Sequence, residues 1–156
     1  MNDGIAIHVA GLGPGSPAHL TAGVRELLAS GMPVILRTRH HPVVAAIPGL
    51  AAARDCDDLY ATAESFEAVY LAAARRVLDG AAGGPVIYAV PGHPLMAEQS
   101  VTRLLAMAHE RGLAVRVYPG VSFADVAAAA LGLDLGTVQL CDGLEPRIDT
   151  WRPALI

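Results

Sequence analysis

The sequence predicts an α/β fold in which a mostly parallel sheet carries helices on both faces, followed by the start of a second α/β domain. Two observations favour this class. Short apolar runs alternate along the chain with longer segments of helical periodicity, which is typical of stacked β-α units. In addition, 53% of the 156 residues are hydrophobic, which is ample for the core of one domain or of one domain plus part of a second.

The first elements follow from local signals. Residues 5–10 have the continuous apolar character of a buried strand. Ser16 and Pro17 are typical of a helix N-terminus, and Gly31 is typical of the end of a helix. The apolar face of this helix consists of Leu20, Val24, Leu27 and Leu28. Strands are then expected at 33–38 and, more weakly, at 51–56, with a short helical turn beginning at His41-Pro42.

The clearest helix runs from Glu64 to about Asp79 and is closed by Gly80. Its apolar stripe consists of Phe66, Val69, Tyr70, Ala73 and Val77. Such a stripe predicts a helix face that packs on the core.

The remaining elements divide the chain into two expected domains. A strand at 85–90, a helix at 95–111 and a strand at 113–118 complete an N-terminal α/β domain over residues 1–118. Beyond it, "SFADVAAAALGL" predicts a helix, and "TVQLCD" and "RPALI" predict strands. We interpret residues 119–156 as the beginning of a second, truncated α/β domain.

Composition excludes several classes of protein. All 11 basic residues are arginines and the formal net charge is -4, which argues against nucleic-acid binding. No apolar run is long enough for a membrane span, and the N-terminus lacks the features of a signal peptide, so a cytoplasmic protein is expected. The six histidines lack metal-binding spacing, and Cys56 and Cys141 are expected to be buried, inert thiols; no metal site is predicted.

The first glycine-rich loop, "GLGPG" at residues 11–15, does not fit a dinucleotide site. Its third glycine comes one residue early for G-x-G-x-x-G, and the expected ribose-binding carboxylate is missing. Arg37 and Arg39 lie in that region instead, and arginines there could bind the 2′-phosphate of NADP but not replace the carboxylate that binds the ribose of NAD. The loop therefore needs another explanation.

Two further loops follow predicted strands. "YAVPGHPLMAEQS", at residues 88–100, leaves a buried strand at its carboxyl end, where ligands bind in open α/β sheets. Two prolines there bracket Gly92 and His93; the alternative to a binding loop is a rigid turn with an exposed histidine. In "YPGVS", at residues 118–122, Ser122 is a natural N-cap for the next helix.

Together, the three loops resemble those of the tetrapyrrole methylases, a family that includes precorrin methylases and diphthine synthase. The resemblance is carried by "GLGPG" followed by "LTAG", by "PGHPLM" in place of a "GDP" loop, and by "YPGVS". "FEAVY", "YAVPGHPL" and "DGLE" are most similar to methylase-like domains fused to nucleoside triphosphate pyrophosphohydrolases of the MazG type. The resemblance implies S-adenosylmethionine (SAM) as cofactor, S-adenosylhomocysteine (SAH) as product and a homodimer.

The resemblance also implies site residues. The expected cofactor contacts are Leu12, Gly92, His93, Met96, Ser122 and Phe123. Gly13, Pro14 and Gly15 would line the substrate cleft, and no catalytic side chain is assigned. His93 stands where many members carry aspartate, and it is the loop residue whose pKa range suits a general base.

The leading hypothesis is therefore a SAM-dependent methyltransferase acting on a small molecule such as a tetrapyrrole. The alternative is a non-catalytic domain that binds a ligand and regulates a fused pyrophosphohydrolase, and a third reading is an interaction domain with a vestigial cleft. Conversion of SAM to SAH separates the first from the others. Because the second domain is expected to be incomplete, activity of these 156 residues alone is not expected.

Overall fold

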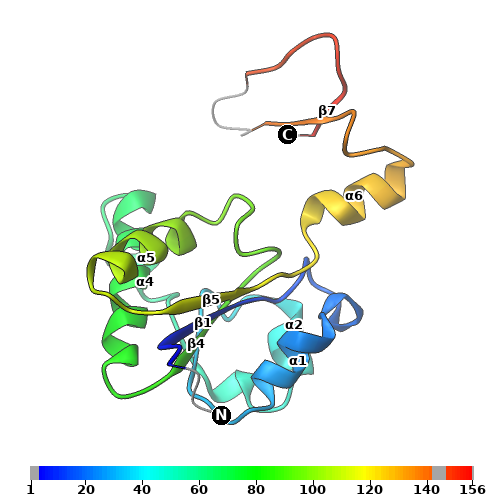
Figure 1. The fold of residues 1–156 in the computed structure, drawn as a ribbon. Coiled ribbons are helices and arrows are strands. Elements are labelled where there is room, and N and C mark those ends of the chain that lie inside the picture. Colours follow the sequence, from blue (N-terminus) through cyan, green and yellow to red (C-terminus); the bar gives the residue numbers. More distant parts are fainter. Residues whose placement is uncertain (1–3, 142–146, 156) are drawn as a thin grey trace. The chain divides into compact units, whose positions relative to one another are not determined.

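The computed structural model describes residues 4–141 and 147–155 (Figure 1). The chain divides into two compact units, residues 1–121 and 122–156, which are treated separately below. The "DGLE" segment of the sequence resemblance lies outside the described residues.

The first unit is built on a five-stranded sheet whose strand pairs are all parallel. Its order is β3-β2-β4-β1-β5. The strands are β1 (Ile7–Gly11), β2 (Val34–Leu36), β3 (Arg54–Asp55), β4 (Val86–Val90) and β5 (Val115–Tyr118). The predicted parallel α/β fold is thus confirmed, and the weakly predicted strand at 51–56 is a short edge strand.

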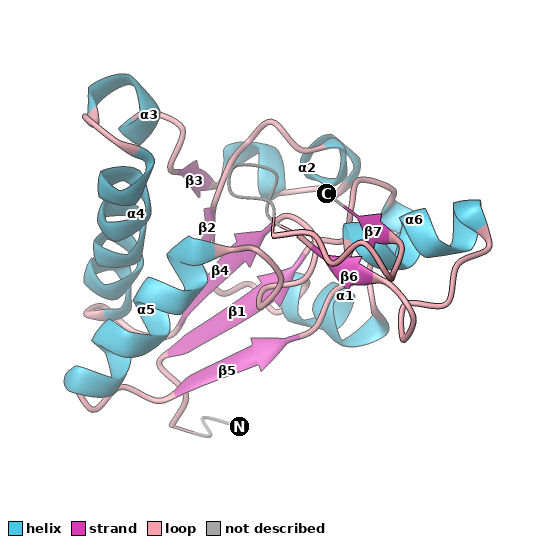
Figure 2. Cartoon of the chain, turned by 90° about the horizontal axis from the view of Figure 1, so that it is seen from above, coloured by secondary structure: helices cyan, strands magenta, loops and turns pink. Residues whose placement is uncertain are grey.

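Helices cover both faces of this sheet (Figure 2). α4 (Phe66–Ala81) and α5 (Gln99–Glu110) pack on one face, in a core cluster that includes Val9, Tyr88 and Leu104. α1 (Ala22–Leu28) and α2 (Pro42–Ala46) pack on the other, with Ala10, Leu36 and Ile87. The shorter elements of this unit are the 3-10 helices η1 (Pro17–His19) and η2 (Leu50–Ala52) and the helix α3 (Leu59–Thr62). The continuous apolar runs of β1 and β4 follow from burial on two faces.

The predicted first helix is two elements. Ser16 accepts a hydrogen bond from the Ala18 amide and caps only the 3-10 helix η1. The α-helix begins after Thr21, whose side chain accepts from the Val24 amide. The chain thus contains two successive cap signals, and the one without proline starts the longer helix.

Two side chains expected in the core lie elsewhere. Phe66, at the first position of α4, is 66% exposed, because the buried side of α4 is formed by Val69, Ala73, Ala74, Val77 and Leu78. Cys141 is only partly buried. Cys56 is buried as expected, and burial raises the pKa of its thiol to about 11, as befits an inert thiol.

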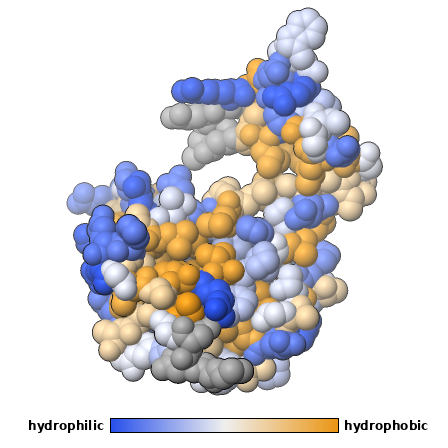
Figure 3. All heavy atoms as spheres, viewed as in Figure 1, coloured by the Kyte–Doolittle hydropathy of each residue, from blue (hydrophilic) through white to orange (hydrophobic). Residues whose placement is uncertain are grey.

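β5 forms an open edge of the sheet. Its Val115 and Val117 are only partly buried, and Figure 3 shows a band of apolar side chains over this part of the first unit. No helix in the described part of the chain is long and apolar enough to cross a membrane.

The described residues of the second unit form one helix and a two-stranded sheet. α6 (Phe123–Leu131) is capped by Ser122 and ends at Gly132, which adopts a left-handed conformation. β6 (Gln139–Leu140) and β7 (Ala154–Leu155) pair in parallel and lie in the two segments expected to form strands. That these residues begin a second α/β domain stays a prediction.

Candidate functional site: three loops at the carboxyl edge of the sheet

The topology directs attention to the carboxyl ends of β1 and β4. These strands are neighbours in the sheet, but the chain leaves β1 toward α1 on one face and leaves β4 toward α5 on the other. Such a switch point is where open α/β sheets bind ligands. The glycine-proline loop at 11–15 and the loop at 91–98 are the connections that leave it.

Backbone hydrogen bonds tie these two loops together. The Gly92 amide donates to the Gly13 carbonyl at 2.8 Å, and the Gly13 amide donates to the Gly92 carbonyl at 3.2 Å. Two loops that are about 80 residues apart in the sequence thus form one antiparallel bridge.

The third loop joins them through Gly120. A Cβ atom on Gly120 would lie 2.3 Å from the Gly92 carbonyl oxygen and 2.9 Å from the Gly11 Cα. A Cβ on Gly11 would lie 2.6 Å from the same oxygen. Only glycine allows this approach of three backbones. The loops at 11–15 and 91–98 therefore converge with Pro119–Gly120 at one edge of the sheet.

The residues of the first loop take different positions. The Leu12 side chain is 1% exposed and packs within the core cluster of α1 and α2. This side chain therefore contacts the core, and a cofactor contact at Leu12 would have to involve its backbone. Pro14 is exposed, and Gly15 is partly buried. His41 stabilises the loop, since its Nε2 donates a hydrogen bond to the Gly13 carbonyl at 3.1 Å.

The second loop is held by its own hydrogen bonds. The Leu95 amide donates to His93 Nδ1 at 3.1 Å, and the Met96 amide donates to the His93 carbonyl at 3.0 Å. A neutral His93 that accepts through Nδ1 carries its proton on Nε2. This nitrogen is a hydrogen-bond donor, whereas the lone pair that a general base needs is already engaged.

Ser122 and Phe123 belong to the second unit. Ser122 forms a capping box with Asp125: its Oγ accepts from the Asp125 amide at 3.2 Å, and its amide donates to the Asp125 carboxylate at 2.7 Å. The predicted cap role of Ser122 is therefore confirmed. Phe123, at the first position of α6, is 49% exposed.

Arg37 and Arg39, the arginines weighed for a dinucleotide phosphate, are both engaged by protein groups. The Arg37 guanidinium lies 5.0 Å from the Tyr60 ring centroid and 5.2 Å from that of Tyr70. Arg39 Nε donates to Asp55 at 2.8 Å, and its two other nitrogens contact the carbonyls of Ala51 and Ala53. These contacts give the arginines roles in the fold.

Sequence reasoning missed a buried polar chain that leads to the start of α5. Glu98 caps α5, accepts from the Ser100 hydroxyl at 2.6 Å, and lies 3.5 Å from Arg37 Nε. Ser100 Oγ is in turn 2.7 Å from the Tyr88 hydroxyl. The available signals were a charged residue ending an apolar strand and a tyrosine inside another, because each needs a polar partner when buried.

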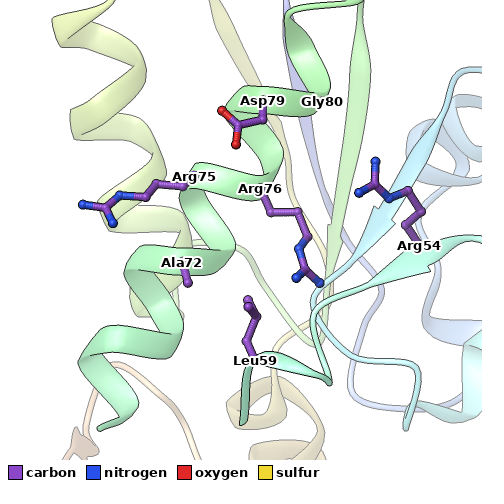
Figure 4. A pocket seen from close by; sticks show the side chains of 7 residues that line it. All are labelled: Arg54, Leu59, Ala72, Arg75, Arg76, Asp79 and Gly80. Carbon is purple, nitrogen blue, oxygen red and sulfur yellow. The ribbon is translucent and has the colours of Figure 1, made fainter. Parts of the chain in front are cut away.

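The hollow of about 370 Å³ in Figure 4 lies away from the three loops. Its lining comes from β3, α3 and α4: Arg54, Leu59, Ala72, Arg75, Arg76, Asp79 and Gly80. Arg76 is paired with Asp58, and Arg75 points away from Arg54 and Arg76 (Figure 4). Its arginines do not converge on one point, so we place the candidate site at the loops. Within the described residues, no group of three or more His, Cys, Asp or Glu side chains could hold a metal ion.

Comparison with solved structures identifies proteins of the same fold. The methyltransferase CobJ superposes with a TM-score of 0.63 at 28% identity, over 90% of this chain and 58% of CobJ. Diphthine synthase gives a TM-score of 0.65 at 15% identity, over 86% of this chain and 52% of that chain. Uroporphyrin-III C-methyltransferase from Thermus thermophilus, solved in complex with S-adenosylhomocysteine, gives 0.58 at 24% identity, over 89% and 56%. The chain thus spans little more than half of these proteins.

Sequence comparison agrees with the structural one. The uncharacterized protein YabN of Bacillus subtilis (strain 168) is 36% identical over 129 residues, which is 82% of this chain and 26% of YabN. Residues 6–154 match the family model for tetrapyrrole (corrin/porphyrin) methylases. With that match over nearly its whole length, the chain belongs to the tetrapyrrole methylase family.

Proposed function

We propose that the protein is part of a SAM-dependent methyltransferase of the tetrapyrrole methylase type, with the cofactor held at the loops that follow β1 and β4. The observation that carries the proposal is the close packing of Gly11, Gly92 and Gly120 at the switch point of the sheet. Family membership supports SAM as the cofactor and a tetrapyrrole as the class of acceptor.

The loop at 91–98 fits a nucleoside thioether. Gly92 has a φ of 64°, and a Cβ there would meet no atom within 4 Å, so the side of Gly92 from which a side chain would project is open. His93 offers an Nε2–H donor for a hydroxyl or carboxylate oxygen, and Met96 offers a half-buried apolar surface. In the proposed site these three residues hold the cofactor, with the Leu12 backbone, Ser122 and Phe123 as further contacts inferred from the family resemblance.

The chemistry requires little of the protein beyond alignment. Bound SAM supplies an electrophilic methyl group on a sulfonium. The loops keep donor and acceptor in line and exclude water, which can supply most of the rate acceleration. The bridge between Gly13 and Gly92 fixes the first loop relative to the second, so Gly13, Pro14 and Gly15 present a rigid edge to the acceptor. The proposed role of His93 is to bind the cofactor. It does not act as a general base, because its Nδ1 already accepts from the Leu95 amide.

A regulatory domain that binds a ligand without turnover is the second candidate. The presence of His93, a donor, where many family members have an aspartate acceptor favours it. The whole of YabN is much longer than the matched region, which accommodates a further domain in a protein of that kind. Incubation with SAM and an acceptor mixture separates the candidates, since only a methylase produces SAH.

Calorimetric titration with SAH tests the site. His93→Asp restores the commoner family residue, and an aspartate can accept the Leu95 amide in the same way, so the loop should keep its shape. Because aspartate lacks the Nε2–H donor that the proposed site uses, we expect weaker SAH binding if position 93 contacts the cofactor. His109→Asp, on the exposed last turn of α5, is the matched control and should leave affinity unchanged. An unchanged dissociation constant for His93→Asp would remove position 93 from the site.

A further inference from the structure

The loop at 91–98 ends on a nearly buried ion pair. The side chains of Arg37 and Glu98 are 8% and 13% exposed, and 3.5 Å separates Arg37 Nε from Glu98 Oε1. Arg37 follows β2 directly, whereas Glu98 is the N-cap of α5. The pair therefore links the end of one strand to the point at which the loop becomes a helix.

The Glu98 carboxylate is also the end of a directed hydrogen-bond chain. It accepts from the Ser100 amide at 3.1 Å and from the Ser100 hydroxyl at 2.6 Å. Because the single Ser100 hydroxyl proton is used there, the Tyr88 hydroxyl must donate to Ser100 Oγ, 2.7 Å away. Burial raises the pKa of Tyr88, so this donor keeps its proton. The chain joins the middle of β4 to the end of the loop that leaves it.

Arg37 is held in one place by its surroundings. Burial by itself lowers the pKa of Arg37, but Glu98, Tyr88 and Tyr60 together raise it by more than that. The net shift is upward, so the guanidinium stays charged. Tyr60 and Tyr70 contact the guanidinium with their rings. Within the described residues Arg37 Nε has no hydrogen-bond partner, so Glu98 acts on it as a charge rather than through a short hydrogen bond.

The residue before Glu98 shows that the loop needs to be held. Ala97 has a φ of 55°, and among the described residues it is the only non-glycine residue with a positive φ. A residue with a Cβ adopts this conformation only where its surroundings enforce it. Glu98, which follows it immediately and is held by Arg37 and Ser100, can enforce that conformation.

We propose that Arg37 and Glu98 are positioning residues, which hold the loop at 91–97 in the shape that contacts the cofactor. They act through the loop, because the residues proposed to contact the cofactor, Gly92, His93 and Met96, lie between β4 and Glu98. This inference rests on the proposed function for its effect on SAH, but its effect on the loop stands without it.

Glu98→Gln is the informative variant. The glutamine oxygen can still accept from Ser100, so the cap remains while the charge opposite Arg37 is lost. If the binding-competent loop falls to about one tenth of the population, the apparent dissociation constant for SAH rises roughly tenfold. The matched control is Glu67→Gln, which also removes the carboxylate partner of an arginine, Arg103, but in an exposed pair between α4 and α5.

Two measurements on the full chain decide the matter. The first is SAH titration of wild type, Glu98→Gln and Glu67→Gln at a temperature at which all three are folded. The second is hydrogen exchange of the Leu95 and Met96 amides without ligand, which should accelerate in Glu98→Gln alone. The double variant Arg37→Met with Glu98→Gln should lose less affinity than the sum of the single variants, since the two residues act as a pair.

The outcomes are distinct. Unchanged exchange at Leu95 and Met96 in Glu98→Gln overturns the proposal, whatever happens to affinity. Faster exchange along the whole of α5, equal to that in the loop, also overturns it, because the pair would then only stabilise the helix. If wild type does not bind SAH while the loop amides respond as expected, the proposed function fails and the positioning role stands.

Discussion

Gly120 is the residue at which the loop packing can be tested most directly. Gly120→Ala would place a methyl group 2.3 Å from the Gly92 carbonyl oxygen, and neither backbone can move aside without breaking the bridge between Gly13 and Gly92. We expect a loss of about 3 kcal/mol of folding free energy. Urea unfolding measures it.

Gly23→Ala is the control for that substitution. Gly23 lies inside α1, and a Cβ there would meet no atom within 4 Å. Alanine favours the helix, so this variant should gain about 0.5 kcal/mol. Equal stability of Gly120→Ala and wild type would show that the three loops do not pack as described.

His41 makes the first loop sensitive to pH. Its Nε2 donates to the Gly13 carbonyl, and its buried Nδ1 has no hydrogen-bond partner in the described part of the chain. Burial lowers the pKa of His41 below 6.5, although the Gly13 hydrogen bond opposes this. The unfolded chain therefore binds a proton more readily, and stability should be full above about pH 6.5 and fall as the pH drops below it.

The measurement is the free energy of unfolding in urea between pH 5 and pH 8, compared with His41→Gln. A glutamine amide can donate to the same carbonyl but does not titrate, so the variant should lose less stability on acidification. His109→Gln, at an exposed position, should follow wild type. If wild type and His41→Gln have parallel pH profiles, His41 is protonated without cost and the supporting role fails.

At the scale of elements, the caps distinguish the two helices that replace the predicted one. Thr21 caps α1 and also donates to the Pro119 carbonyl at 3.4 Å, which connects this helix to the third loop. Thr21→Ala should cost about 1–2 kcal/mol. Ser16→Ala removes a cap from one exposed 3-10 turn and should cost roughly 0.5 kcal/mol or less. Thermal unfolding of both variants gives the comparison, and a larger loss at Ser16 would contradict the observed boundary.

The elements also show what sequence reasoning can reach. β1 and β4 are buried on both faces, so their apolar runs are unbroken and predict strands directly. The sequence predicts that α5 starts at residue 95, but it starts at Gln99, because residues 94–97 form a turn and a bend in which Ala97 is left-handed. No local pattern predicts that conformation, since the contact of Glu98 with Arg37 joins residues about 60 positions apart.

For the candidate site, too, local sequence patterns predict some features and miss those that depend on contacts between distant residues. The three loops could be found from their glycines and prolines and from their resemblance to tetrapyrrole methylase motifs. In the structure the first two loops lie together with Pro119–Gly120. The buried Leu12 side chain and the support from His41 could not be found, because both depend on packing across the sheet. The cofactor roles of the loop residues remain a prediction.

At the scale of the whole molecule, the core of the first unit is self-contained. Both large apolar clusters, on the α4–α5 face and on the α1–α2 face, are drawn from residues before Pro119. The third loop contributes Gly120, which also belongs to this unit. We therefore expect residues 1–121 to fold when residues 122–156 are deleted.

Scanning calorimetry of residues 1–121 and of residues 1–156 tests this expectation. The shorter chain should unfold in one cooperative transition with an enthalpy on the order of 80 kcal/mol, as for other domains of this size. Its hydrogen-exchange protection in β1 and β4 should match that of the longer chain, because these strands pair with each other and their buried side chains belong to clusters of first-unit residues. A broad transition without cooperativity, together with lost protection in β4, would mean that residues beyond Val121 complete the core. The unit that carries the loops at 11–15 and 91–98 would then be larger than the clusters on its two faces indicate.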